Sequence, residues 1–467
     1  MIARAIPPGV TIRGHRSLLV ALNGPPLLRH AARLVPIFAA SVVCPCASSR
    51  AQPPAEAHEA DSADAPTVER EKLTGNWWGA RDSLEAKGVS FELAAVYVFQ
   101  NVAAGGIGGT RFTSRSDESD SGNTLLGSLD LGLDTAKAGM WPGGSLDVQL
   151  QGRTGRSVVQ RAGTVSPVNN TATMPNVVDR FDESAFAVTQ VCYTQSICDW
   201  LGVYGGLLNT SEGDENDIAG SGVSNSHFFN SALLYSLVGN ATCPNVSLGG
   251  GLLFEPSDRL SGSLSATTSS ELAGEDPFEN ADGLTLCTEW TRKHTLFDLP
   301  GAQTAGFLYG MNIDRTDISK SPRVIISGAL EGEPIPTTSS DTWALYYNAS
   351  QFLSGDAEKG WGLFARLGIS DGDPNPIRWN FAGGIGGVGT FAGRDSDRWG
   401  AGVYYIGMSD AALLAGLNIG DEVGFETFYS IALAPWWRIS FDGQAVDSAI
   451  PTVDTAVVLG VRVEVDF

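Results

Sequence analysis

Three short motifs in this 467-residue sequence have the spacing of chemical sites, and the first is a candidate nucleophile. Gly368, Ser370 and Gly372 fit the G-x-S-x-G turn that exposes the serine of many hydrolases. Such an enzyme needs a histidine later in the chain, but the last histidine is His294. The motif therefore predicts glycines that end a strand at a loop.

The second motif is a glycine pattern typical of dinucleotide binding. Gly384, Gly386 and Gly389 fit G-x-G-x-x-G, which holds a phosphate only when a strand precedes it and a helix follows. No helix signal follows here, so we interpret these glycines as small residues on a closely packed strand wall.

The third motif resembles the start of a calcium-binding loop, at Asp371, Asp373 and Asn375. Pro376 occupies the position of the central glycine, and Ala382 that of the bidentate glutamate, so the stretch is not expected to bind calcium as an EF-hand does.

Two further features could bear on metal binding. The acidic stretch 212–217 could hold divalent cations loosely; the alternative is that these are solvated charges of a loop. His58, His227 and His294 are scattered along the mature chain. We therefore expect no specific metal site, no cofactor and no catalytic residue.

The elements that position the remaining polar residues are strands, and the clearest is the final stretch AVVLGVRVEVDF, residues 456–467. Every second residue, from Val457 to Phe467, is apolar, while Arg462, Glu464 and Asp466 lie on the other face. A half-buried strand of a soluble sheet can alternate in the same way. An aromatic carboxy-terminus favours the closing strand of an outer-membrane barrel.

Composition agrees with a chain of strands and turns. Glycine is abundant, with 56 residues, and only 18% of residues are charged. No apolar run reaches the length of about 18 residues that a spanning helix needs. The formal net charge is −22, which makes nucleic acid a poor partner.

The chain divides into four predicted parts. Residues 1–51 have the features of an export signal, with Arg29 and Arg33 before an apolar stretch and small residues before a cut after Ala51. Residues 52–72 form an acidic flexible lead, 73–89 a helical segment, and 90–467 the barrel domain.

Four cysteines remain after the predicted cut: Cys192, Cys198, Cys243 and Cys287. Cys192 and Cys198 flank a plausible hairpin turn, but three pairings are open.

Strand-like stretches recur about sixteen times, an even number within the range of outer-membrane barrels. They lie near residues 90–99, 124–134, 145–153, 183–192, 200–209, 247–256, 260–270, 284–293, 303–313, 342–353, 361–370, 378–388, 399–409, 422–433, 437–447 and 456–467. Short and long connections alternate between them, as expected for periplasmic turns and extracellular loops. We therefore predict an all-β, transmembrane antiparallel β-barrel with a short N-terminal helical segment.

Several segments resemble the carbohydrate-selective porins of the OprB type. Leu73 to Gly88 carries a Thr-Gly, a Trp-Gly, an Arg and a Leu before a Lys-Gly, in the order of that family's amino-terminal signature. The stretches LDLGLDTAKAGMWPGGSLDVQ, FARLGISDGD, GRDSDRWGAG and FYSIALAPWWRISFDGQ are also similar to the family. One departure is Gly206-Leu207, where the family commonly has Gly-Lys, so a basic group near the constriction is missing.

Nine inward-facing residues are candidates for lining the pore and contacting sugar. A sugar-selective pore should offer paired polar groups beside aromatic faces. The candidates are Arg153, Phe364, Arg366, Glu426, Arg438, Asp442, Gln444, Arg462 and Glu464. For each of them, an inward ion pair that braces the barrel wall is the alternative. Residues 210–246, with the SHFFNS core at 226–231, are our candidate for a loop folded into the pore, with an extracellular lid as the alternative.

The resemblance implies a porin of the bacterial outer membrane that lets mono- or small oligosaccharides diffuse passively. The barrel rests on the strand pattern as well, whereas the sugar preference rests on the resemblance alone. The acidic charge also fits a general, cation-leaning diffusion porin, and a non-transporting barrel is a further alternative. We expect outer-membrane lipid as a partner and leave homo-oligomerisation open.

Overall fold

The computed structural model describes residues 70–107, 119–175, 184–243, 245–269, 273–274, 282–331 and 333–467. The predicted export signal and nearly all of the acidic lead lie outside these residues. No helix in the described part of the chain is long and apolar enough to cross a membrane.

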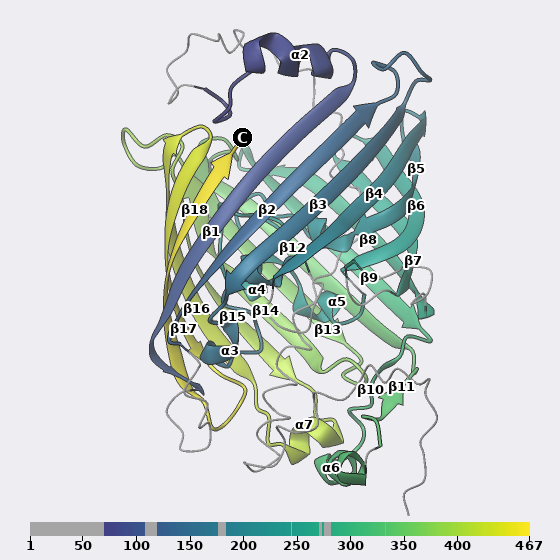
Figure 1. The fold of residues 1–467 in the computed structure, drawn as a ribbon, viewed down its shortest axis with the longest axis vertical. Helices are drawn as coiled ribbons and strands as arrows, with labels where there is room; N and C mark the ends of the chain where they lie inside the picture. The colour runs from purple at the N-terminus through teal and green to yellow at the C-terminus, as the bar shows by residue number, and fades with distance from the viewer. Residues whose placement is uncertain are drawn as a thin grey trace, which may run out of the picture.

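Sixteen antiparallel strands close into one barrel, in which β1 pairs with β18 (Figure 1). The strands are β1 (Val89–Gly106), β2 (Ser121–Asp134), β3 (Gly144–Arg156), β4 (Ala185–Cys198), β5 (Leu201–Asn209), β6 (Val246–Ser257), β7 (Leu260–Ser269), β8 (Asp282–Leu296), β9 (Leu299–Met311), β12 (Thr342–Gly355), β13 (Gly360–Ser370), β14 (Ile377–Val388), β15 (Arg398–Met408), β16 (Glu422–Ala434), β17 (Trp437–Asp447) and β18 (Asp454–Asp466). Closure leaves no unpaired edge strand. The predicted fold class is confirmed, and every predicted strand is present.

Side chains alternate between the two faces of the wall as predicted. On β13, Leu363 and Leu367 are 45% and 49% exposed, whereas Arg366 between them has no exposed surface. On β18, Leu459 is exposed and its neighbour Val458 is buried. The outer face is therefore apolar, and the inner face carries the polar residues.

The two ends of the barrel differ in the length of their connections. Links such as 199–200, 258–259 and 297–298 lie at one end, which we call the short-turn end. The opposite, long-loop end carries β10 (Arg315–Thr316), β11 (Thr337–Thr338), α6 (Pro322–Glu331) and α7 (Ala412–Gly416). Figure 1 shows these elements at the bottom and α2 at the top. The predicted alternation of short and long connections is confirmed.

The amino-terminal segment packs on the short-turn end, beside the carboxy-terminus. It contains η3 (Trp77–Gly79) and α2 (Ala80–Glu85), close to the predicted helix. Arg81 Nη2 donates to the Phe467 carbonyl oxygen at 3.0 Å, and its guanidinium lies 4.7 Å from the centre of the Trp77 ring. These contacts tie the start of the barrel to its last residue.

The hairpin pairing considered for Cys192 and Cys198 is wrong. Both residues lie on β4, which runs to Cys198, and the turn comes only after it. Six residues along an extended strand span about 20 Å. A disulfide needs Cα atoms within about 7 Å, so these two thiols cannot bond.

Candidate pore constriction

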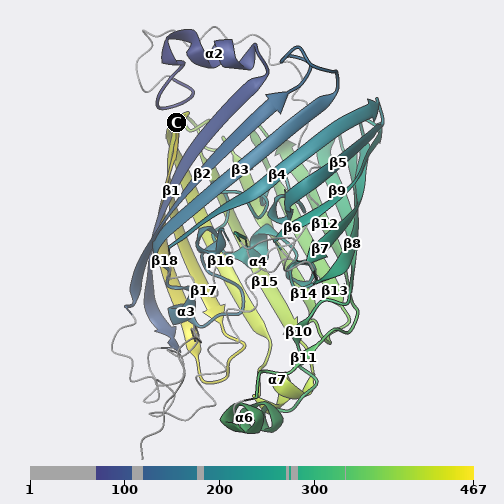
Figure 2. The same cartoon turned by 45° about the vertical axis from the view of Figure 1, so that its right-hand side comes forward.

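Two connections at the long-loop end turn back into the barrel. The first inward loop, residues 157–175, contains α3 (Val159–Ala162) and η5 (Asn170–Thr173). The second inward loop, residues 210–245, contains η6 (Thr210–Glu212), α4 (Ser231–Leu234) and α5 (Leu237–Asn240). Figure 2 shows α4 surrounded by the strands, and α5 contacts β12, β13 and β14. The prediction that the segment 210–246 folds into the pore is confirmed, and the lid alternative is wrong.

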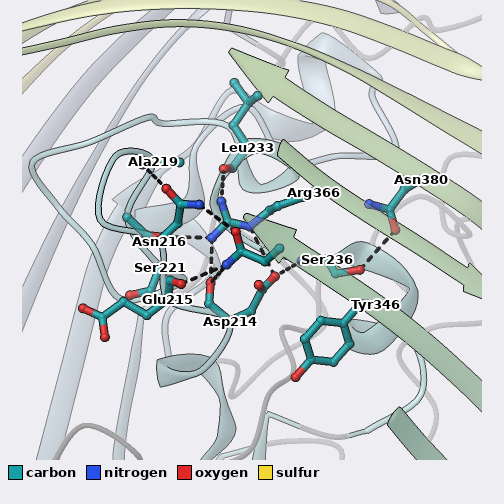
Figure 3. Close-up of polar contacts among 12 residues, drawn as sticks. Asp214, Glu215, Asn216, Ala219, Ser221, Leu233, Ser236, Tyr346, Arg366 and Asn380 are labelled. Atoms are coloured by element: carbon teal, nitrogen blue, oxygen red, sulfur yellow. Dashed lines mark hydrogen bonds and ion pairs between the residues drawn. The ribbon is translucent and has the colours of Figure 1, made fainter. Parts of the chain in front are cut away.

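A buried ion pair holds the second inward loop to β13. Arg366 Nε lies 3.2 Å from Asp214 Oδ2, and neither side chain has exposed surface. The same guanidinium donates to the carbonyl oxygens of Asp214, Gly220 and Leu233 (Figure 3). The Asp214 carboxylate also accepts from the Ser236 backbone N–H at 2.8 Å. One wall arginine therefore fixes the loop at several points along its length.

Two glutamates on β16 each hold one inward loop by a pair of adjacent backbone N–H groups. The Glu422 carboxylate accepts from residues 165–166 of the first loop, at 2.5 and 2.9 Å. The Glu426 carboxylate, on the same face of the strand, accepts from residues 229–230 of the second loop, at 2.6 and 2.9 Å. Both side chains are fully buried. A buried carboxylate requires such donors, so these contacts fix the height of each loop in the barrel.

The tip of the second loop is clamped between β18 and β13. Arg462 Nη2 donates to the His227 carbonyl oxygen at 2.5 Å, and its guanidinium lies 4.0 Å from the centre of the Phe229 ring. Phe228 packs on Phe364, with ring centroids 5.4 Å apart. The SHFFNS core therefore meets an arginine on one side and an aromatic ring on the other.

Other predicted pore residues hold the first inward loop. Arg153 Nη1 donates to the Ala172 carbonyl oxygen. Gln444 Nε2 donates to the Val168 carbonyl oxygen at 2.8 Å and to the Asp442 carboxylate at 2.9 Å. These side chains bind loop backbone, so they help to set the shape of the passage.

The last two candidates, Arg438 and Glu464, lie directly opposite each other on β17 and β18. Both side chains keep part of their surface exposed. All nine candidates thus lie on the inner face, but most of them contact the inward loops directly.

Glycines on the inner face make room for the second loop. A Cβ added at Gly402 would lie 2.8 Å from the Leu233 side chain, closer than real Cβ contacts. One added at Gly384 would lie 2.2 Å from the Ala401 carbonyl oxygen. The interpretation of the Gly384-x-Gly386 pattern as a closely packed wall is confirmed.

The other two motifs are part of the connection between β13 and β14. Ser370 Oγ donates to the Ile377 carbonyl oxygen at 2.6 Å, and Asn375 Nδ2 donates to the Val238 carbonyl oxygen at 3.0 Å. Within the described ranges, no group of three or more His, Cys, Asp and Glu has the arrangement of a metal site. These residues shape the loop.

The first inward loop and Glu422 are functional features that the sequence reasoning missed. A usable signal was the absence of charge. No Asp, Glu, Lys or Arg occurs between residues 218 and 254, and Arg161 is the only charged residue in the first loop. An uncharged loop can enter a barrel without leaving an unpaired charge behind, so such runs mark inward loops.

A small recess lies on the short-turn side of the second loop. His227 and Asp217 line it from the loop, and Arg398, Phe352 and Phe428 line it from the wall. The constriction therefore has a polar and aromatic pocket on one side.

Comparisons with known proteins agree with this geometry. A family model described as "Carbohydrate-selective porin, OprB family" matches residues 126–467. The high-pH structure of Pseudomonas putida OprB is similar, with a TM-score of 0.72 and 21% identity over 86% of this chain and 100% of that chain. Its low-pH structure has a TM-score of 0.52 and 18% identity over 86% and 99%. No curated protein sequence matches the chain.

Proposed function

Because the chain belongs to the carbohydrate-selective porin (OprB) family, we propose that sugars cross the barrel through a passage bounded by its two inward loops. The protein is a porin of the bacterial outer membrane that passes carbohydrates by diffusion. Its apolar outer face lies against membrane lipid, and transport requires no cofactor and no chemical step.

The observation that carries the proposal is the anchoring of the inward loops. A sixteen-strand barrel without inward loops encloses a wide aqueous channel. Here Arg366, Glu422 and Glu426 fix two loops inside it through buried, charge-assisted contacts. A passage narrowed in this way selects solutes by size, so monosaccharides should cross faster than larger oligosaccharides.

The nine candidate residues divide between two proposed roles. Arg153, Phe364, Arg366, Glu426 and Gln444 hold the loops, because their side chains bind or pack against loop residues. Arg462 also holds the second loop, because it donates to the His227 carbonyl oxygen and contacts the Phe229 ring, and Asp442 supports Gln444. We assign direct contact with passing sugar to Arg438 and Glu464, which keep exposed surface. Guanidinium and carboxylate groups at neighbouring positions can bind adjacent sugar hydroxyls with two hydrogen bonds each.

Conductance in planar bilayers tests the proposed function. We expect stepwise insertion of open channels whose current falls when glucose is added, because a bound sugar occupies the passage. An unblocked current with a strong cation preference would indicate a general diffusion porin instead. Absence of any conductance step would indicate a barrel that transports nothing.

A further inference from the structure

Two cysteines meet at the place where the second inward loop returns to the barrel wall. Cys243 follows α5 in that loop, and Cys287 lies on β8. The structure contains both as buried thiols, 5% and 4% exposed, and both belong to the main apolar cluster inside the barrel. They are far apart in the sequence, so only the fold brings them together.

The sulfur of Cys243 lies beside a threonine of the wall. The Cys243 backbone N–H donates to the Gly239 carbonyl oxygen at 3.2 Å, which continues the turn of α5. Its Sγ lies 3.9 Å from the Oγ1 of Thr267, a residue of β7 that is 2% exposed. The Cys243 side chain therefore points at the wall and not into the passage.

Cys287 is next to the same threonine, on the adjoining strand. Thr267 pairs with Thr285 of β8, and Cys287 follows two residues later on the same inner face. Leu286, between them, is exposed on the outer face. In an antiparallel pair, the Cβ atoms of such diagonal neighbours are about 7 Å apart. The two sulfur atoms therefore flank one threonine.

The strand on the other side of β8 gives the same placement. Leu308 of β9 lies opposite Cys287, and Gly310 is two residues further along that strand. A Cβ added at Gly310 would lie 3.5 Å from the Thr242 carbonyl oxygen, and one added at Gly239 would lie 3.6 Å from Leu308 Cδ1. Gly239 and Thr242 thus lie over β9 while Cys243 touches β7, so the chain crosses β8 close to Cys287.

The other two described cysteines lie further away. Cys192 on β4 is in the same row as Thr267, to which it is connected through the successive pairs with Gly206 and Gly249. Three strand spacings, about 14 Å along the wall, separate Cys192 from Thr267. Cys198 lies beyond it, at the short-turn end of β4. A disulfide needs Cα atoms within about 7 Å, so Cys287 is the nearer partner for Cys243.

The compartment through which the chain passes supplies the oxidant that such a pair needs. An outer-membrane protein crosses the periplasm, where disulfides form and persist. Each thiol gives up its proton, and the pair loses two electrons as the S–S bond forms. The disulfide of a periplasmic thiol oxidoreductase takes up both protons and both electrons and becomes two thiols.

We propose that Cys243 and Cys287 form a disulfide that fastens the returning end of the second inward loop to β8. Charged contacts hold the middle and the tip of this loop, and Arg315 donates to the Thr242 carbonyl oxygen at 2.6 Å just before Cys243. The covalent bond adds a fixed point where uncharged residues enter the wall. The inference does not depend on which solute crosses the barrel.

Peptide mapping of protein taken from outer membranes and denatured in N-ethylmaleimide, without reductant, tests the bond. An endoproteinase that cleaves after Asp and Glu separates the two cysteines, because residues 218–255 contain only Cys243 and residues 283–289 contain only Cys287. Mass spectrometry should find these two peptides joined, at a mass two hydrogens below their sum. Reduction should separate them.

Cys192→Ser is the matched control, because Cys192 is also buried but lies on a distant strand, and the joined peptides should persist in it. Cys287→Ser should leave Cys243 modified by N-ethylmaleimide without reduction. Modification of both Cys243 and Cys287 in wild type would overturn the proposal, as would a bond from Cys243 to the peptide 184–199. The wild-type map decides the question even if a variant does not fold.

Thermal denaturation tests whether the bond stabilises the barrel. Dithiothreitol should lower the melting temperature of the wild type by several degrees, because the reduced chain is less constrained when unfolded. Cys287→Ser lacks the bond and should melt at the same temperature with and without dithiothreitol. An unchanged wild type, or an equal shift in both proteins, would overturn the fastening role.

Discussion

Arg366 and Asp214 face each other at 3.2 Å inside the barrel, and neither side chain has exposed surface. The pair joins a wall strand to a loop that enters from the long-loop end. Because both charges are buried, removal of one leaves the other unpaired in a dry environment. The position of the second inward loop therefore depends on this single contact more than on any exposed ion pair.

Arg366→Ala should release the second inward loop. We expect a higher single-channel conductance, weaker sugar block, and a free energy of unfolding lower by about 3–5 kcal/mol. Planar-bilayer recording and thermal denaturation measure these changes. Lys359→Ala is the control, since it breaks an exposed pair with Asp395 and should cost less than about 1 kcal/mol. Wild-type conductance in Arg366→Ala would contradict the anchoring role.

Glu422→Ala and Glu426→Ala should loosen different loops. Each carboxylate accepts two backbone N–H groups, and those of residues 165–166 and 229–230 belong to separate segments. Amide hydrogen exchange, followed by mass spectrometry, should rise mainly in 157–175 for the first variant and in 226–231 for the second. Equal increases in both segments in both variants would show that the two glutamates do not act separately.

Asp397, in the turn before β15, should make stability depend on pH below about 4. Burial raises the pKa of Asp397, but hydrogen bonds from Arg394, Ala432 and Tyr429 lower it more, so its pKa lies below the ordinary value. Because the pKa of Asp397 is lower in the folded than in the unfolded protein, the ionised carboxylate stabilises the fold fully at pH values above the unfolded pKa. That stabilisation is lost as the pH falls through the folded pKa.

Asp397→Asn should therefore lower the melting temperature at pH 7 by several degrees. The difference from wild type should begin to shrink below the unfolded pKa of about 3.9 and be smaller at pH 3, because the stabilisation is lost as the pH falls towards the lowered folded pKa. Asp395→Asn, in the same turn but exposed, should show little difference at either pH. A constant difference between pH 7 and pH 3 would rule out the carboxylate charge as the cause.

Cys198 should react with a water-soluble maleimide without prior reduction, because its side chain is exposed at the short-turn end. Mass spectrometry of the non-reduced protein should locate the label on the peptide with Cys198. Cys198→Ala should remove it. A disulfide between Cys192 and Cys198 would be incompatible with the extended strand that separates them.

The strands could be predicted from the sequence because each residue of a barrel wall must face either lipid or lumen. Leu363, Arg366 and Leu367 show this plainly, since their order alone assigns each to a face. The roles of the inward residues could not be predicted in this way. Arg366 and Asp214 are 152 residues apart, and alternation contains no information about which loop reaches a given side chain.

The first inward loop was missed for a related reason. Its path is set by Glu422, Gln444 and the second loop, and none of these contacts is local. The Asn170 N–H donates to the Phe229 carbonyl oxygen at 2.7 Å, so each loop supports the other. The near absence of charge in residues 157–175 and its absence from residues 218–245 mark both stretches as buried, but only the fold shows where they meet.

The central claim is that the anchored loops narrow an open sugar channel, and swelling of proteoliposomes in sugars of graded size tests it most directly. With wild-type protein we predict rapid swelling in xylose and glucose and much slower swelling in maltose and maltotriose. With Arg366→Ala this difference should diminish, because the second loop no longer narrows the passage. Equal rates for all four sugars in wild type, or no swelling in any of them, would contradict the account.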